Sequence, residues 1–150
     1  MTPKPDWGPE DRSAFLAFER YFSWAETMRT DFEGRRSAYT DNENQVHWEP
    51  YLAYWYGGLF AVTEGWTDLE FEDPEIGGLL GQAETLKILS RYRNGAFHFQ
   101  RDYFDPRFVD LWESEDVDLL ATQLHRAFDR WIQQDLPKIL ESTFPKRDPR

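Results

Sequence analysis

The chain has 150 residues, of which 40% are hydrophobic and 17% aromatic, so it has enough length and apolar bulk for one domain with a buried core. The absence of cysteine excludes disulfides and cysteine-ligated zinc, and the net charge of −11 argues against general binding of nucleic acid. The N-terminal residues lack the apolar segment of a signal peptide, and no apolar run approaches the roughly 18 residues that span a bilayer, so we expect a cytoplasmic protein with no membrane partner.

The first part of the chain predicts an irregular arm followed by a long helix. Residues 1–9 hold three prolines and a glycine, and Trp7 is the side chain expected to anchor this arm. A helix is expected from Glu10 to Phe32, ended by Gly34, before a polar connector over residues 35–45. Its apolar residues recur at helical spacing, and these are Phe15, Phe18, Phe22, Ala25 and Phe32. The charged residues expected to face away are Glu19, Arg20, Glu26 and Arg29.

A second helix is expected over residues 48–66, beginning near Pro50 because proline suits a first helical turn. Its apolar face comprises Leu52, Trp55, Tyr56, Leu59, Val62 and Trp66. The pair Gly57-Gly58 costs about 1 kcal/mol per residue relative to alanine, which predicts a close contact with another helix at this point. Residues 67–82 contain the run D-P-E-I-G-G, which predicts a loop.

The third helix is expected over residues 83–99. At about 100° per residue, its apolar face comprises Ile88, Leu89, Tyr92, Ala96 and Phe99. The opposite face comprises Lys87, Arg91, Asn94 and His98, with Arg93 on a flank beside Phe97. Residues 87–107 carry five cations against two acids, whereas the rest of the chain carries 12 cations and 26 acids. This basic island (residues 87–107) can hold a phosphate at short range in a protein that is acidic as a whole.

After a turn at Pro106, the last helix is expected over residues 115–136, with Ser114 as its N-cap and Pro137 at its end. Its apolar face comprises Val117, Leu120, Leu124, Phe128 and Trp131. His47 and His125 match no metal motif, so both are interpreted as surface or packing residues, and no cofactor is expected. We therefore expect an all-α bundle in a single domain over residues 1–150, with an ordered core over about 10–140 between a flexible arm and tail.

The segment Arg93-Asn94-Gly95-Ala96-Phe97-His98 has the R-x4-H form of the motif that marks the HEPN superfamily, the nucleotide-binding domains of higher eukaryotes and prokaryotes. Asn94 fits this motif, because a polar residue commonly follows the arginine. The chain thus resembles a HEPN protein over about residues 10–140, with the motif near the end of the third long helix. This resemblance implies a four- to five-helix up-and-down bundle, commonly a homodimer in which the two motif helices meet.

The resemblance also implies a function. Many HEPN members are metal-independent endoribonucleases of toxin or defence type, and others are inactive and only bind or scaffold. RNA or a nucleotide is therefore the implied ligand, and a cognate antitoxin or a nucleotidyltransferase is a further implied partner. In one subgroup the motif is R-x4-H-x-Tyr, and a partner nucleotidyltransferase modifies that tyrosine. This chain has Gln100 at that position and Tyr103 three residues later, so it departs from the subgroup and its mode of control.

The motif residues suit cleavage of RNA by its own 2′-OH without a metal ion. A histidine can transfer a proton near neutral pH, and a dimer would supply one His98 as base and one as acid. Arg93 can bind phosphate bidentately and stabilise charge in the transition state. Asn94 lies one helical turn before His98 and can orient the imidazole or the phosphate. The cations expected to hold flanking phosphates are Lys87, Arg91 and Arg101.

Simpler alternatives stand beside these roles. Arg93 can pair with one of the 28 acids, and Gly95 can end the helix and so change the faces of the residues that follow. If the helix continues, Gly95 leaves room for a neighbouring backbone and Phe97 offers a dimer surface. Two functions stay open: an RNA-cleaving enzyme, favoured by the Arg93/His98 pair, and a non-catalytic helical module that binds a nucleotide or a partner protein, favoured by the net charge.

Overall fold

The fold is all-helical, as the sequence predicts. The structure, a computed structural model, describes residues 6–38 and 45–146, with the side chains of 38 and 45–47 left out, and over these ranges it contains no strand. Its helices are α1 (Asp11–Ala38), α2 (Gln45–Asp68), α3 (Pro74–Leu80), α4 (Ala83–Phe97), α5 (Pro106–Glu113), α6 (Asp116–Gln134) and α7 (Leu136–Thr143). The four long helices α1, α2, α4 and α6 correspond to the four expected from the apolar spacing.

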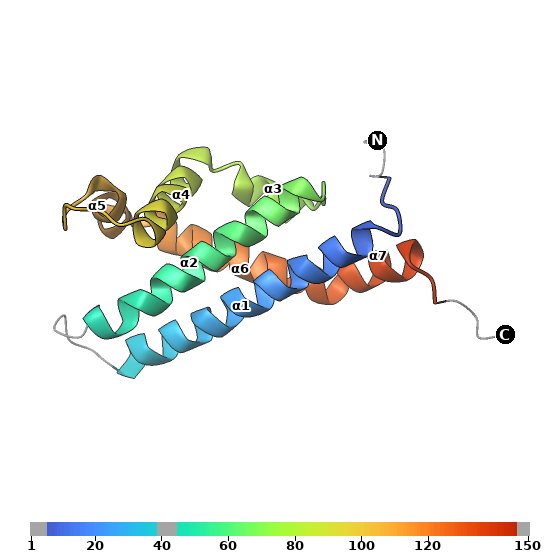
Figure 1. The fold of residues 1–150 in the computed structure, drawn as a ribbon, viewed down its shortest axis with the longest axis horizontal. Coiled ribbons are helices and arrows are strands. Elements are labelled where there is room, and N and C mark those ends of the chain that lie inside the picture. Colours follow the sequence, from blue (N-terminus) through green and yellow to red (C-terminus); the bar gives the residue numbers. More distant parts are fainter. Residues whose placement is uncertain (1–5, 39–44, 147–150) are drawn as a thin grey trace.

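Helices α1 and α2 form a long antiparallel pair, and this is the most extensive contact between helices in the fold (Figure 1). Helix α6 lies against both of them, and α4 lies against α2 and α6. The short helix α5 packs on α4 at one end of the molecule, whereas α7 lies beside the start of α1 at the other end (Figure 1). The α4–α5 corner therefore lies at the opposite end of the molecule from residues 6 and 146, the first and last residues that the structure describes (Figure 1).

Aromatic rings make up the centre of the core where α1, α2 and α6 meet. Trp66 and Trp131 lie with ring centroids 4.7 Å apart in an edge-to-face arrangement. Phe18 contacts both rings edge-on or tilted, and Phe71 packs 4.6 Å from Trp131. Such pairs add about 0.5–1.5 kcal/mol each beyond the area they bury, so this cluster fixes how the three helices are oriented.

The Gly57-Gly58 pair confirms the predicted close contact. A Cβ at Gly58 would lie 3.3 Å from the Cβ of Ala25, which shows how closely α1 and α2 approach. A Cβ at Gly57 would lie 2.5 Å from the ring of Phe97, which is shorter than real Cβ contacts. Gly57 therefore makes the space that Phe97, at the end of α4, occupies on α2.

Two short helices replace segments predicted as a loop and a turn. In α3 the Asp73 side chain accepts a hydrogen bond from the Ile76 amide at 3.0 Å, and in α5 the Asp105 side chain accepts one from Arg107 at 2.9 Å. In both, an Asp N-cap is followed by proline at the first position, which also occurs in turns. The predictions over 67–82 and around Pro106 were wrong because docking of Ile76 and Leu111 in the core stabilises these short helices.

Several helix ends also differ from the predictions. Helix α1 passes through Gly34 to Ala38, and residues 39–44 of the expected connector lie outside the described part of the chain. Ser114 does not cap α6, because its amide donates to Leu111 and closes α5, and Glu115 takes the N-cap position. Trp7 does anchor the arm, since its indole N–H donates to the Leu69 carbonyl at 3.0 Å. Residues 1–5 and 147–150, assigned to the flexible arm and tail, lie outside the described residues.

A membrane-spanning helix would need a long stretch of apolar residues, and none of the helices in the described ranges provides one.

Candidate functional site

The R-x4-H motif lies at the C-terminal end of α4, and the helix ends inside it. Helix α4 stops at Phe97, and His98 has an extended backbone with φ −125° and ψ 124°. The predicted apolar face is right for Leu89 and Tyr92, which are buried, but wrong for Phe99, which is 91% exposed. The helical period does not apply to residues beyond Phe97, so Phe99 points out into solvent.

Gly95 is buried because α5 covers it. A Cβ at this position would lie 3.0 Å from the Cβ of Arg107 and 3.3 Å from the ring of Phe108. Gly95 therefore makes room for α5 of the same chain. Phe97 remains 49% exposed, although one side of its ring rests on Gly57 and Tyr54. Both residues thus have partners within the chain, which weakens the two observations from which a dimer surface was predicted.

Arg93 forms an ion pair with α2. Its guanidinium donates to the Glu64 carboxylate at 2.9 Å and lies over the ring of Phe60, 4.4 Å from the centroid. The neighbouring Asn94 oxygen is 3.4 Å from the same guanidinium. The Arg93 side chain is 27% exposed, so a phosphate could reach it only in competition with Glu64. This confirms the alternative in which Arg93 pairs with an acid from another helix.

Acids neutralise most of the basic island. Arg91 pairs with Asp110 of α5 at 2.6 Å, and Arg107 pairs with Asp105 at 3.2 Å. Within the described ranges, the two island cations that have no ion-pair partner are Lys87 and Arg101, and both are exposed. Only these two are free to attract a flanking phosphate without first losing an intramolecular partner.

His98 lines a pocket of about 320 Å³ between the end of α4, the following loop and α5. Four rings line it, those of Phe99, Tyr103, Phe108 and Trp112. Its polar side chains are His98, Gln100, Asp102 and Glu49, the last from the start of α2. Neither Arg93 nor Asn94 is among the lining residues. The structure therefore places His98 in the pocket and the Arg93 guanidinium against α2, and within the described chain no hydrogen bond joins the two side chains.

Glu49 is a pocket residue that the sequence did not indicate. The Trp112 indole donates to its Oε1 at 3.2 Å, and burial raises the pKa of the Glu49 carboxyl. Its second oxygen, Oε2, has no hydrogen bond within the described ranges. These two residues are 63 positions apart, and only the docking of α5 near the start of α2 brings them together. No local pattern could have found this contact.

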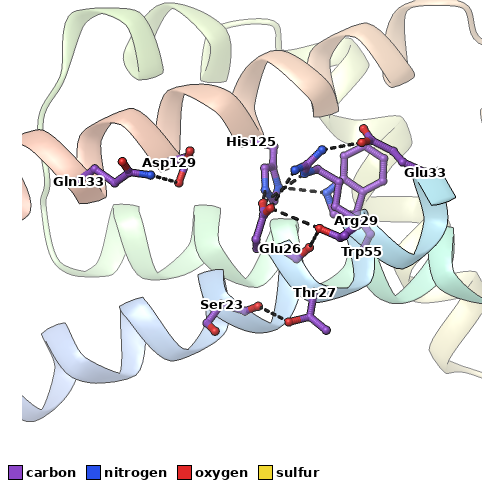
Figure 2. Close-up of polar contacts among 10 residues, drawn as sticks. Ser23, Glu26, Thr27, Arg29, Glu33, Trp55, His125, Asp129 and Gln133 are labelled. Carbon is purple, nitrogen blue, oxygen red and sulfur yellow. Dashed lines mark hydrogen bonds and ion pairs between the residues drawn. The ribbon is translucent and has the colours of Figure 1, made fainter.

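A second polar cluster lies inside the core around His125 of α6 (Figure 2). The Trp55 indole N–H donates to His125 Nδ1 at 3.1 Å, and Nε2 on the other side of the ring contacts Glu26. Glu26 in turn pairs with Arg29 at 2.8 Å. An indole nitrogen can only donate, so Nδ1 carries no proton, and the neutral ring donates from Nε2 to Glu26. Glu26 thus points towards the core, contrary to the prediction.

The His125 cluster stabilises the fold and is not a site. His125 is 2% exposed, and both of its ring nitrogens are bonded, so no substrate can reach it. Its interpretation as a packing residue is confirmed, whereas the side chain of His47 lies outside the described part. Across the described residues, every buried side-chain nitrogen and oxygen has a hydrogen-bond partner. The Trp55–His125–Glu26 contacts provide these hydrogen-bond partners where α1, α2 and α6 meet.

This cluster predicts that acid destabilises the protein from near neutral pH downwards. Burial lowers the pKa of His125, so the unfolded chain binds this proton first and stability falls as the pH drops below about 6.5. Burial alone would raise the pKa of Glu26, but hydrogen bonds with Arg29 and His125 outweigh burial and lower it, so its contribution is lost at still lower pH. Urea unfolding between pH 7.5 and 5.5 should show a decline of at most about 1.4 kcal/mol per pH unit from His125.

His125→Gln is the matched control for this pH dependence. Glutamine can accept from Trp55 and donate to Glu26, but it does not titrate. The variant should therefore lose the decline between pH 6.5 and 5.5, whereas His98→Ala should keep it. An unchanged slope in His125→Gln would show that other groups cause the acid sensitivity.

No match is found when the chain is compared with models of protein families, with curated proteins and with solved structures. Among the described residues, no three or more His, Asp or Glu side chains are grouped so that they could hold a metal ion. The chemistry of the motif residues and of the His98 pocket is therefore the basis on which a function can be inferred.

Proposed function

We propose that the chain is a metal-independent endoribonuclease that acts through His98 and Arg93, as in the HEPN proteins that its R-x4-H motif resembles. The observation that carries the proposal is the His98 ring, which is exposed, has no hydrogen bond within the described ranges, and lines an aromatic pocket. RNA supplies its own nucleophile, so the protein has to move two protons and stabilise charge on phosphorus. An imidazole suits the first task, and exposed aromatic rings can stack the bases of a single strand.

Arg93 would serve the second task by stabilising negative charge on the phosphate. Its pair with Glu64 is partly exposed, and such pairs contribute at most about 1 kcal/mol, so a phosphate can displace the carboxylate at small cost. The planar guanidinium can then bind two phosphate oxygens at once. Glu64 would thus hold Arg93 ready in the absence of RNA.

A homodimer is part of this proposal, because one chain has a single histidine in the motif. The loop after α4 exposes Phe99 and Phe104, which are 91% and 68% exposed. Large exposed rings are typical of a surface that another molecule covers. We expect the ends of the two α4 helices to meet there, bringing two copies of His98 together. A monomer in sedimentation velocity at micromolar concentration would contradict the dimer.

The second candidate is a non-catalytic module that binds a nucleotide or a partner protein. The observation that favours it is the pairing of Arg91, Arg93 and Arg107 with acids, which leaves little free positive charge. Aromatic rings can bind a base or an apolar side chain without such charge. Both candidates use the same pocket, and they differ in whether the protein cleaves a phosphodiester bond of RNA.

Incubation of the purified protein with total RNA in EDTA tests the choice. Cleavage should persist in EDTA and should leave 2′,3′-cyclic phosphate ends, because the attacking group is the 2′-OH of the RNA. Single-stranded DNA lacks that hydroxyl and should stay intact. Binding of RNA without any new ends would favour the module over the enzyme.

The Arg93–Glu64 ion pair between α4 and α2 leads to a second prediction. Arg93→Ala should lower the cleavage rate by about 10²-fold, and Arg93→Lys should not restore it fully, since lysine lacks the planar fork. Glu64→Gln removes the competing charge and should keep the parental rate or exceed it. Single-turnover rates on one oligoribonucleotide would measure all three variants. Equal losses in Arg93→Ala and Glu64→Gln would show that the pair only supports the structure.

A further inference from the structure

The His98 pocket combines flat apolar surfaces with two carboxylates, of which Glu49 is half-buried and Asp102 is exposed. Phe108 and Trp112 lie nearly parallel, at 30° with centroids 6.0 Å apart, and Tyr103 lies 6.3 Å from Trp112 at 46°. Tyr103 and Trp112 are 76% and 37% exposed, so part of each ring is accessible to a planar ligand. A volume of about 320 Å³ is at the small end of ligand pockets, suited to one ring system and its substituent.

Two carboxylates supply hydrogen-bond acceptors to this pocket, whereas the His98 ring, unbonded within the described ranges, supplies both a donor and an acceptor. The Gln100 amide is held in place, since it donates to the His98 carbonyl and accepts from Arg107, both at 2.7 Å. Asp102 Oδ1 accepts from the Phe104 amide at 2.9 Å and caps the loop. Glu49 Oε1 accepts from Trp112, and its Oε2 lacks a donor within the described ranges. A ligand that brings an N–H group would supply the bond that Glu49 Oε2 lacks.

Glu49 is the polar group best placed to select a ligand. It lies on α2, a regular helix, and Trp112 fixes its orientation, whereas Asp102 is exposed on a loop. Glu49 is half-buried and accepts one neutral donor but has no cationic partner in the described ranges, so its Oε2 is open to a ligand that donates a hydrogen bond. Ligands that donate to it gain affinity, and ligands that present a carbonyl oxygen to it are rejected.

We propose that this pocket binds a nucleobase with an exocyclic amino group, stacked on Tyr103 and Trp112 with the amino N–H donated to Glu49. Adenine, cytosine and guanine carry such a group, whereas uracil places carbonyl oxygens on both sides of its only ring N–H. Glu49 is then a specificity-determining residue, and the inference rests on the proposed function in that RNA supplies the base. His98, in the same pocket, would lie next to the ribose phosphate of the bound nucleotide.

Calorimetric titration of the full chain with mononucleotides in EDTA tests this without any need for cleavage. CMP and AMP should bind about tenfold more tightly than UMP, the scale of one good base contact. Tryptophan quenching by CMP should be lost in Trp112→Phe, which locates the base. A six-residue oligocytidylate that binds more tightly than CMP would show that the pocket reads a base within a strand, and equal affinity would indicate a free nucleotide as the ligand.

Glu49→Gln should remove the discrimination, because an amide can donate to uracil as well as accept from cytosine. Asp102→Asn is the matched control, since it makes the same charge change in the same pocket and should keep the preference for CMP. Circular dichroism would check that both variants fold. The inference is overturned if UMP binds as tightly as CMP, or if Glu49→Gln leaves their ratio unchanged. It is also overturned if tetramethylammonium quenches Trp112 and nucleotides do not, which would identify a cage for cations.

These results separate the inference from the proposed ribonuclease. If the protein binds CMP more tightly than UMP but produces no new RNA ends, the base pocket is supported and the ribonuclease is excluded. If it cleaves RNA through His98 but shows no base preference in binding, the ribonuclease is supported and the role of Glu49 is excluded.

Discussion

Replacing His98 with alanine should lower the rate of RNA cleavage by on the order of 10²-fold or more, the usual scale for a lost general acid or base. The loss should be specific to catalysis, because the His98 ring is exposed and makes no hydrogen bond within the described ranges. The backbone bond that closes α4 runs from the His98 amide to Asn94, so the substitution leaves it in place. The free energy of unfolding should therefore change by no more than about 0.5 kcal/mol.

His98→Gln is the matched variant for this experiment. Glutamine keeps a polar side chain of similar reach but cannot exchange a proton near neutral pH, so it should be as slow as alanine. Rates would be measured in EDTA on one oligoribonucleotide, with circular dichroism and urea unfolding on the same samples. A folded His98→Ala protein that cleaves as fast as the parent would exclude the catalytic role and favour the binding module.

The sequence predicts the long helices well because apolar spacing reports burial directly. Phe15, Phe18 and Phe22 on α1 recur at helical spacing and are all buried. The same signal is missing from α3 and α5, which are each too short for a repeating pattern. Their existence depends on a capping aspartate and on one side chain that docks in the core, Ile76 in α3 and Leu111 in α5.

Only some of the residues of the candidate site can be predicted from the sequence. The R-x4-H spacing predicts His98 and Arg93 as site residues, but helical periodicity does not say which residue of another helix each will meet. Glu64, which pairs with Arg93, lies 29 positions earlier, and Glu49 comes from the far end of the same helix. The sequence places Phe99 on the wrong face because it extends the helical period two residues past Phe97, the real end of α4.

The core offers the prediction with the largest expected effect on stability. His125→Leu keeps an apolar side chain of similar size but removes the acceptor of the Trp55 N–H, in a region where no water can replace it. An orphaned buried donor costs about 1–3 kcal/mol, and Glu26 also loses a partner, so we expect a destabilisation of at least about 2 kcal/mol. Urea unfolding monitored by circular dichroism would measure it.

A double-mutant cycle with Trp55→Phe separates the hydrogen bond from the packing. Trp55→Phe leaves a cavity and an orphaned His125 nitrogen, whereas the double variant removes both polar partners at once. The double variant should therefore be more stable than the sum of the single losses predicts, by about 1–2 kcal/mol. Simple additivity would show that Trp55 and His125 contribute to the core only through the volume they fill. In that case the tautomer fixed by the indole would have no thermodynamic consequence.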